Sequence, residues 1–238
     1  MKIVFCDLDG TVLLPREKAL SKSAVDGIKK ILDNNIIFCV ASGRCYSELK
    51  RIFDGFDDKV YFIPSDGSLI VYKEETLYKC PVDKGNLSFL DEERDYVLHG
   101  KYVSFVKSCK DTFVRKIKEQ YNGHIKRILN YKEIDEEVYK LSLYNSQRVI
   151  PLDNVYKDYS IREFVNNTNK GNAVKKLLEI LSLDKKDAVS LGDGINDIEM
   201  FEETGEAYAM VQAPPIVKKK ATGIVQSFSQ FTDKVVKE

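Results

Sequence analysis

Two aspartates, Asp7 and Asp9, form the most reactive pair of side chains in the sequence. They follow a continuous apolar run over residues 3–6, which is typical of a strand buried on both faces. In an extended backbone, residues two apart project to the same side, so the two carboxylates would share one small volume. One ionised carboxylate can attack phosphorus, while the other gives a proton to the leaving oxygen and later takes one from water. A divalent cation beside one of them would let the pair work in different charge states.

The next two residues, Gly10 and Thr11, favour the binding of an anion. A glycine lets main-chain N–H groups turn toward a phosphate, a geometry that a bulky residue would hinder. An ordinary polar turn between a strand and a helix is an equally good interpretation of residues 7–11 alone. A calcium loop is disfavoured, because Val12 stands where the EF-hand turn needs glycine.

A second acidic cluster, Gly192-Asp193-Gly194-Ile195-Asn196-Asp197, again follows an apolar run and precedes a helical pattern. Asp193 lies between two glycines and can approach a cation closely. Asn196 and Asp197, in the first turn of the helix, can orient a water molecule or a phosphate. The alternative is structural, since Gly-Asp-Gly is a common turn and aspartate commonly begins a helix.

Ser42 and Lys170 are candidates for contacts to a phosphoryl group. Ser42 offers a hydroxyl, and with Gly43 it offers main-chain amides, at the start of a predicted helix, where anions bind readily. A simple helix N-cap explains Ser42 equally well. Lys170, followed by Gly171, can place a positive charge on a phosphoryl oxygen, although a lone lysine is more often a surface residue.

The elements around these residues predict an α/β fold with a doubly wound parallel sheet. Buried strands and amphipathic helices alternate at both ends of the chain, and this order is typical of such sheets. We expect strands over 3–6, 36–41, 60–63, 187–192, 206–210 and 222–226, and helices over 22–33, 45–53, 170–181, 196–203 and 214–220. Every candidate residue then lies at the carboxyl edge of the sheet or in a loop leading back to it, where ligands bind.

The middle of the chain has a different character. A hairpin over 69–73 and 76–80 ends at Pro81, and the continuous apolar runs are absent from there to about residue 160. We predict a core domain of residues 1–81 and 160–238 and an inserted, smaller α/β domain of residues 82–159 with one open sheet face. Within the insert we expect helices over 86–98 and 110–121 and strands over 101–107, 125–130 and 138–145.

The composition excludes several other classes of protein. Lys plus Arg and Asp plus Glu each total 37, so no global charge attracts nucleic acid or an anionic membrane. No stretch approaches the roughly 20 apolar residues of a membrane span. The 5 cysteines lack disulfide or zinc spacing, and only 2 histidines occur. We expect a cytoplasmic protein with reduced thiols. Carboxylates, rather than histidines or cysteines, are the abundant side chains for its chemistry.

The order of these motifs resembles the haloacid dehalogenase (HAD) superfamily, and residues 170–200 resemble its Cof-type branch, in which an α/β cap is inserted. The resemblance implies that Asp7 is the nucleophile and Asp9 the acid/base. It implies a phosphate site made of Gly10, Thr11, Ser42, Gly43, Lys170 and Asn196. It also implies Mg²⁺ held by Asp7, the Asp9 carbonyl and Asp193. Asp197 would act on the metal through water or through the residues that bind it. Asp66 departs from the branch, which often has Asn-Gly-Ala at this point.

The resemblance implies a Mg²⁺-dependent phosphatase that hydrolyses a small phosphomonoester, with sugar phosphates as the first choice, through an aspartyl-phosphate. Two alternatives stay open: a phosphomutase-type phosphotransferase, and a non-catalytic phosphate-binding regulatory module. We expect a small phosphorylated metabolite as partner, no nucleic acid, no membrane, and a monomer or weak homodimer. Four cations of the insert are interpreted as solvated strand residues rather than substrate contacts: Lys101, Lys126, Arg127 and Lys140.

Overall fold

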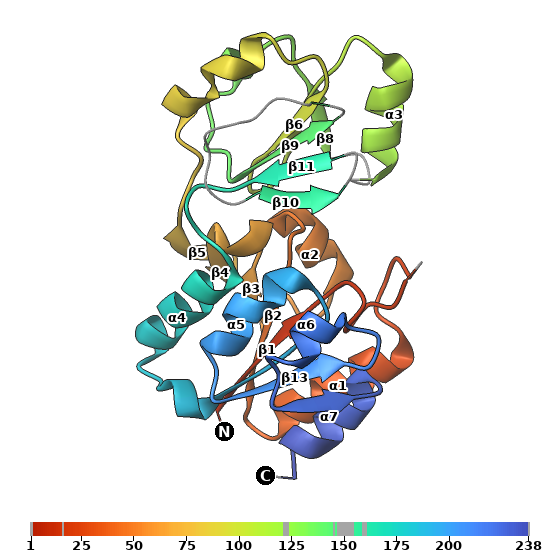
Figure 1. The fold of residues 1–238 in the computed structure, drawn as a ribbon, viewed down its shortest axis with the longest axis vertical. Coiled ribbons are helices and arrows are strands. Elements are labelled where there is room, and N and C mark those ends of the chain that lie inside the picture. Colours follow the sequence, from red (N-terminus) through yellow and green to blue (C-terminus); the bar gives the residue numbers. More distant parts are fainter. Residues whose placement is uncertain are drawn as a thin grey trace.

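The computed structural model shows two β-sheets, one above the other, with helices around each (Figure 1). It describes residues 2–15, 17–120, 124–144, 146 and 161–237, and the backbone alone of 155–158. The larger sheet is built from both ends of the chain, and the smaller one from its middle. We call the smaller sheet, with the segments that cover it, the cap.

The larger sheet has eight strands in the order β14-β13-β12-β1-β2-β3-β4-β5. The first six in this order are parallel to one another, and the last two form an antiparallel hairpin that pairs with β3 in the antiparallel sense. The strands are β1 (Ile3–Asp7), β2 (Ile37–Ala41), β3 (Tyr61–Ile63), β4 (Leu69–Tyr72), β5 (Glu75–Lys79), β12 (Ala188–Gly192), β13 (Glu206–Met210) and β14 (Gly223–Val225). The predicted doubly wound sheet is confirmed.

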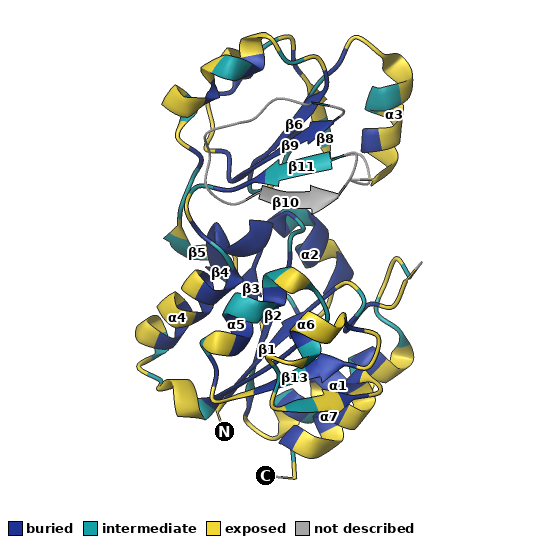
Figure 2. Ribbon diagram, viewed as in Figure 1, coloured by how far each residue is buried: buried dark blue, intermediate teal, exposed yellow. Residues whose placement is uncertain are grey.

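Helices cover both faces of this sheet, so its central strands are buried on both sides (Figure 2). One face carries α1 (Lys22–Asp33), α2 (Tyr46–Ile52) and α7 (Phe228–Val235). The other carries α4 (Lys170–Leu181), α5 (Ile198–Glu202) and α6 (Pro215–Lys218). Helix α7 has no counterpart among the sequence-based predictions.

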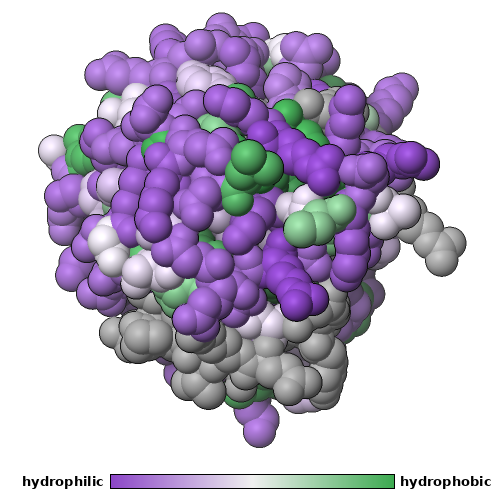
Figure 3. Space-filling view, turned by 90° about the horizontal axis from the view of Figure 1, so that it is seen from above, coloured by the Kyte–Doolittle hydropathy of each residue, from purple (hydrophilic) through white to green (hydrophobic). Residues whose placement is uncertain are grey.

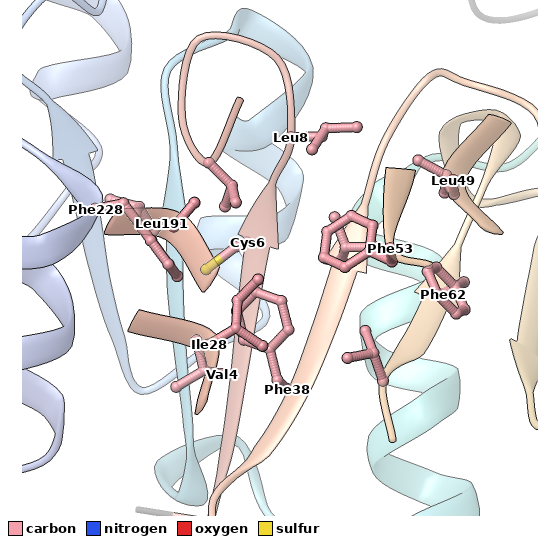
Figure 4. Close-up of a cluster of buried hydrophobic side chains, with 14 of the residues drawn as sticks. Val4, Cys6, Leu8, Ile28, Phe38, Leu49, Phe53, Phe62, Leu191 and Phe228 are labelled. Atoms are coloured by element: carbon pink, nitrogen blue, oxygen red, sulfur yellow. The ribbon is translucent and has the colours of Figure 1, made fainter. Parts of the chain in front are cut away.

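The side chains of β1 show why this strand reads as one apolar run. Val4 and Cys6 pack with Ile28 of α1 and Phe38 of β2 on the first face (Figure 4), while Phe5 belongs to the cluster on the other face. All of them are fully buried. The strand therefore fixes the position of the residue at its end, Asp7, from both sides.

The cap sheet has six strands in the order β10-β11-β9-β6-β7-β8. Neighbouring strands of this sheet are antiparallel, except that β7 and β8 are parallel. The strands are β6 (Tyr96–His99), β7 (Ser104–Lys107), β8 (Ile125–Arg127), β9 (Lys140–Tyr144), β10 (Val155–Asp158) and β11 (Ile161–Phe164), and the helix α3 spans Asp111–Gln120. The surface seen from the cap end is predominantly hydrophilic (Figure 3).

The predicted helix over 86–98 is wrong. A 3₁₀ helix, Lys84–Asp91, occupies the first part of this range, and β6 the last. Tyr96 and Leu98 face an apolar cluster on one side of the sheet, and Val97 faces a second cluster on the other. Pairing of β6 with both β7 and β9 supplies contacts that outweigh the local helical pattern.

The chain passes into the cap after β5 and returns to the larger sheet after β11, which pairs with β9. A core domain with an inserted cap domain stays a proposal, and we now place its second boundary after Phe164 rather than at residue 159. Within the described part of the chain, none of the helices combines the length and apolar character needed to cross a lipid bilayer.

Candidate active site

A buried lysine joins the two acidic motifs at the carboxyl edge of the larger sheet. Asp7 ends β1 and Lys170 begins α4, and both side chains are buried. The Lys170 Nζ donates to Asp7 Oδ1 at 2.6 Å and to Asp197 Oδ1 at 2.7 Å. The sequence made Lys170 a candidate phosphate contact, with a surface lysine as the alternative, and the fold buries it between two carboxylates.

The other oxygen of Asp197 holds the second acidic loop in shape. The main-chain N–H groups of Asp193 and Gly194 donate to Asp197 Oδ2 at 2.9 and 2.8 Å. Both oxygens of Asp197 are therefore bonded within the protein, and the residue is fully buried. This arrangement presents Asp193, which is only partly buried, toward the end of β1.

The electrostatics of this cluster are dominated by burial. Burial raises the pKa of Asp7 to about 8, and repulsion from Asp197 adds to the rise while Lys170 opposes it. The pKa of Asp193 is raised by burial and by Asp197. Burial alone would lower the pKa of Lys170, but Asp197 and Asp7 outweigh it, so this pKa lies above its usual value. Three carboxylates thus surround one lysine, and the surroundings of Asp7 and Asp193 disfavour their charged forms.

Gly10 is required by this geometry. Its φ is +84°, and a Cβ at this position would lie 2.3 Å from Asp193 Oδ2. The neighbouring Thr11 hydroxyl donates to Asp193 Oδ1 at 3.3 Å, and the side-chain amide of Gln212 donates to the Gly10 carbonyl at 2.6 Å. The turn that follows β1 is thus fitted to the second acidic loop.

Asp9 lies in a different environment from Asp7. Because β1 ends at Asp7, the extended backbone that would align the two carboxylates does not continue to Asp9. Its carboxylate accepts two hydrogen bonds from Arg44, from Nε at 2.8 Å and from a terminal nitrogen at 2.6 Å. Sequence reasoning placed Arg44 in a polar loop after β2 but gave it no role, because nothing in the local pattern links residues 35 apart.

The other predicted phosphate contacts lie around Asp66. The Ser42 carbonyl accepts from the Asp66 N–H at 3.1 Å, and the Ser42 hydroxyl accepts from the Arg44 N–H at 3.2 Å. The Asn196 side-chain amide donates to Asp66 Oδ1 at 3.1 Å. A Cβ on Gly43 would lie 3.0 Å from Asp66 Oδ2. Asp66, which stands where the Cof-type branch often has Asn-Gly-Ala, is buried and has a φ of 53°.

Lys140 of the cap reaches into this region, and the expectation that it is a solvated strand residue is wrong. It is 4% exposed. Its Nζ lies 3.0 Å from Asp66 Oδ2, 2.9 Å from the Gly43 carbonyl and 2.6 Å from Glu163 Oε2. A strand of the cap and a loop of the larger sheet therefore share one buried ion pair. The sequence shows no signal for it, because the partners are 74 residues apart.

The carboxylates around Asp7 suit a divalent cation. Oxygen atoms of Asp7, Asp193 and Asp197 all lie within 4.8 Å of one another. Carboxylate oxygens are the ligands that Mg²⁺ prefers in proteins. A cation here would also favour the ionised forms of Asp7 and Asp193, whose pKa values are raised by burial and by repulsion from Asp197. The donor set therefore fits the metal that the sequence predicted.

This combination of a doubly wound sheet, an inserted cap and an Asp–Lys–Asp cluster at the sheet edge defines a class of hydrolase. The chain matches the haloacid dehalogenase-like hydrolase family over residues 4–235, and it belongs to that family. The resemblance inferred from the motifs, including the Cof-type branch, is confirmed. The chain is a phosphoric monoester hydrolase of the HAD type.

Individual relatives cover nearly the whole chain. A phosphatase of Escherichia coli acting on 5-amino-6-(5-phospho-D-ribitylamino)uracil is 22% identical over 233 residues, 90% of this chain and 86% of the relative. A phosphoglycolate phosphatase of Staphylothermus marinus is 24% identical over 248 residues, 98% of this chain and 99% of the relative.

Solved structures show the same fold. A haloacid dehalogenase-like hydrolase from Bacteroides thetaiotaomicron superposes with a TM-score of 0.86 at 21% identity, covering 98% of this chain and 99% of that one. A sugar phosphatase of HAD subclass IIB gives a TM-score of 0.80 at 17% identity and covers 100% of this chain and 97% of that one.

Proposed function

We propose that this protein is a Mg²⁺-dependent phosphatase that hydrolyses a small phosphomonoester of the sugar-phosphate type through an aspartyl-phosphate on Asp7. The observation that carries the proposal is the position of Asp7, which ends a buried strand with one carboxylate oxygen bonded to Lys170. The other oxygen then remains available to attack phosphorus. Relatives that act on phosphorylated metabolites support the class of substrate.

The reaction has two steps in this proposal. An oxygen of Asp7 bonds to phosphorus as the ester P–O bond breaks, and the leaving oxygen takes a proton from Asp9. Water then attacks the aspartyl-phosphate, gives its proton to Asp9 and releases inorganic phosphate and free Asp7. Lys170, Ser42 and Asn196 hold the phosphoryl oxygens, and Gly10, Thr11 and Gly43 shape the loops around them.

Arg44 bears on the acid/base role of Asp9. Both oxygens of the Asp9 carboxylate accept hydrogen bonds from Arg44, which leaves neither of them placed to give a proton to a leaving oxygen. We infer that Arg44 moves from Asp9 when the phosphoryl group binds, since Asp9 must reach the leaving oxygen in the first step. In the second step, Asp9 accepts a proton from the attacking water.

The metal would be held by Asp7, the Asp9 carbonyl and Asp193, while Asp197 keeps Asp193 and Lys170 in place through its own hydrogen bonds. A bound Mg²⁺ supplies positive charge for the phosphoryl oxygens and neutralises charge that develops during transfer. The chain's own contribution is a preformed acidic pocket whose lysine already satisfies two of the carboxylates.

A phosphomonoester panel assayed with and without Mg²⁺ tests this proposal. We expect release of inorganic phosphate that requires Mg²⁺ and is lost in Asp7→Asn, while Asp33→Asn, an exposed aspartate of α1, keeps it. Isomerised ester without free phosphate would instead support the phosphotransferase alternative. Binding of phosphate without any turnover would support the regulatory module.

A further inference from the structure

A pocket of about 380 Å³ lies between the cap sheet and the loop after β2 and reaches Asp9. This volume is at the lower end of the range for ligand sites, roughly 300–1,000 Å³, which suits a small metabolite. Its lining includes Asp9, Arg44 and Glu48 from the larger domain and His99, Lys140 and Glu163 from the cap. Because it adjoins the proposed acid/base, it is the place where the leaving group of the ester would lie.

The two cations of the described lining are already bound to carboxylates. Arg44 holds Asp9 through two hydrogen bonds and lies 3.5 Å from Glu48 Oε1. Lys140 bonds to the carboxylates of Asp66 and Glu163. After Arg44 has moved from Asp9, Glu48 remains its neighbouring carboxylate, so an anionic substituent on the leaving group would compete with a carboxylate at either cation.

Displacement at Lys140 is especially unfavourable. Asp66 is buried, and although burial alone would raise its pKa, Lys140 and Lys170 outweigh that effect and hold the pKa below its usual value. A cation drawn away from Asp66 would leave a buried carboxylate without its closest partner. Lys140 is thus committed to the protein rather than to a substrate.

The remaining charged groups of the described lining are all carboxylates, beside the uncharged residues Gly43, Cys45, His99 and Gln120. Three carboxylates, Asp9, Glu48 and Glu163, line the described pocket against the two cations. Glu163 is the more accessible of the two glutamates, with 32% of its side chain exposed, whereas that of Glu48 is 6% exposed. His99 adds no positive charge, because burial and then Lys140 lower its pKa to about 3. An ionised glutamate accepts hydrogen bonds from hydroxyl groups and repels a carboxylate.

We propose that this pocket selects phosphomonoesters whose leaving group is uncharged and bears hydroxyl groups, and that it rejects leaving groups carrying a carboxylate, with Glu163 as the specificity-determining residue that contacts the substrate. Glu48 contributes to the rejection of carboxylates through its negative charge next to Arg44. The inference rests on the proposed function, because it names the class of ester that the same site hydrolyses. It also predicts that the chain differs in preference from its phosphoglycolate phosphatase relatives.

A matched pair of substrates tests the inference: glucitol 6-phosphate and 6-phosphogluconate, which differ in one terminal hydroxymethyl or carboxylate group. We expect kcat/KM to favour the hexitol ester by about tenfold or more, as one unfavourable charge contact at this range allows. Glu163→Gln should reduce that preference at least about threefold, mainly by improving KM for 6-phosphogluconate. Glu119→Gln, an exposed charge change on α3, should leave it unchanged.

Binding separates this inference from the proposed function. Calorimetric titration of the Asp7→Asn variant with each ester, in the presence of Mg²⁺, should show the same preference without turnover. If the preference is present but neither ester releases phosphate in the wild type, the proposed function fails and the inference stands. Equal affinity, tighter binding of 6-phosphogluconate, no binding of the hexitol ester, or a preference unchanged in Glu163→Gln would overturn the inference.

Discussion

At the scale of single residues, the site depends on close approach between two loops that are distant in the sequence. Gly10 follows the proposed nucleophile, and Asp193 lies against it with no room for a Cβ between them. Thr11 adds a hydrogen bond across the same contact. The positions of the two acidic motifs are therefore set by a glycine as much as by the acids themselves.

Replacement of Gly10 by alanine tests this contact. The new Cβ would meet the Asp193 carboxylate, so Asp193 has to move and its hold on the metal weakens. We expect kcat/KM to fall by about tenfold or more and the Mg²⁺ concentration for half-maximal activity to rise.

Gly55 provides a matched control for this variant. Its φ is +82°, close to that of Gly10, but a Cβ there meets nothing within 4 Å. Both alanine variants pay a backbone penalty of about 1–2 kcal/mol for the left-handed conformation. Only Gly10→Ala should lose activity, and equal losses in the two variants would contradict a specific role for the contact with Asp193.

At the scale of elements, the strength of local pattern decided what the sequence could predict. The predicted helices over 22–33 and 170–181 match α1 and α4, because both have clear apolar periodicity and a capping residue at the start. The site residues at strand ends followed from the same patterns. In the cap, the strands depend on pairing across the sheet, so residues 96–98 of β6 were mistaken for helix, and β10 and β11 were missed.

The N-cap of α1 gives a prediction at this scale. The Ser21 hydroxyl accepts a hydrogen bond from the Ala24 N–H at 3.2 Å. Ser21→Ala should lower the free energy of unfolding by about 1 kcal/mol, measured by urea denaturation. Ser23→Ala, an exposed position inside the same helix, should have little effect. An equal loss in both variants would contradict a specific contribution of the Ser21 cap.

A second prediction at this scale concerns the ion pair between Lys140 of β9 and Asp66. Lys140→Met leaves Asp66 and Glu163 without their shared cation, and we expect a loss of about 3 kcal/mol or more in stability, since Asp66 is buried. Thermal and chemical unfolding measure this loss.

Two further variants check its cause. Adding Asp66→Asn to Lys140→Met removes the uncompensated buried charge and should recover part of the loss. Lys126→Met, at an exposed position of β8, should be close to wild type. If the double variant is less stable than Lys140→Met alone, the ion pair is not the source of the effect.

At the scale of the whole molecule, the site is assembled from residues that no local pattern connects. Arg44 had no assigned role and Lys140 was expected to be solvated, yet each bonds to an aspartate in a loop of the larger sheet. Their partners lie 35 and 74 residues away, and only the folded arrangement of sheet and cap brings them together. A cytoplasmic location and the oligomeric state stay predictions.

The buried histidine of the cap makes the stability of the molecule dependent on pH. His99 lies between the hydroxyls of Ser104 and Ser142, and burial lowers its pKa to about 3, with Lys140 adding to the effect. Between about pH 6.5 and 3 the unfolded chain binds a proton that the folded one does not, so stability falls as the pH falls. The expected loss is about 1.4 kcal/mol per pH unit across this window.

Replacement of His99 by glutamine should remove this contribution. The variant is expected to lose stability near pH 7 but to lose less than the wild type on acidification to pH 4. His124→Gln, at an exposed position, should follow the wild type. Parallel pH profiles for wild type and His99→Gln, measured by urea denaturation, would contradict the assignment.

The most direct test of Asp7 as the nucleophile is the release of inorganic phosphate from a sugar phosphate, measured with and without Mg²⁺ for the wild type, Asp7→Asn and Asp33→Asn. We expect Mg²⁺-dependent release by the wild type and Asp33→Asn, and none above background by Asp7→Asn. Release that is independent of Mg²⁺, or that persists in Asp7→Asn, would contradict the role of Asp7 as the nucleophile of a metal-dependent phosphatase.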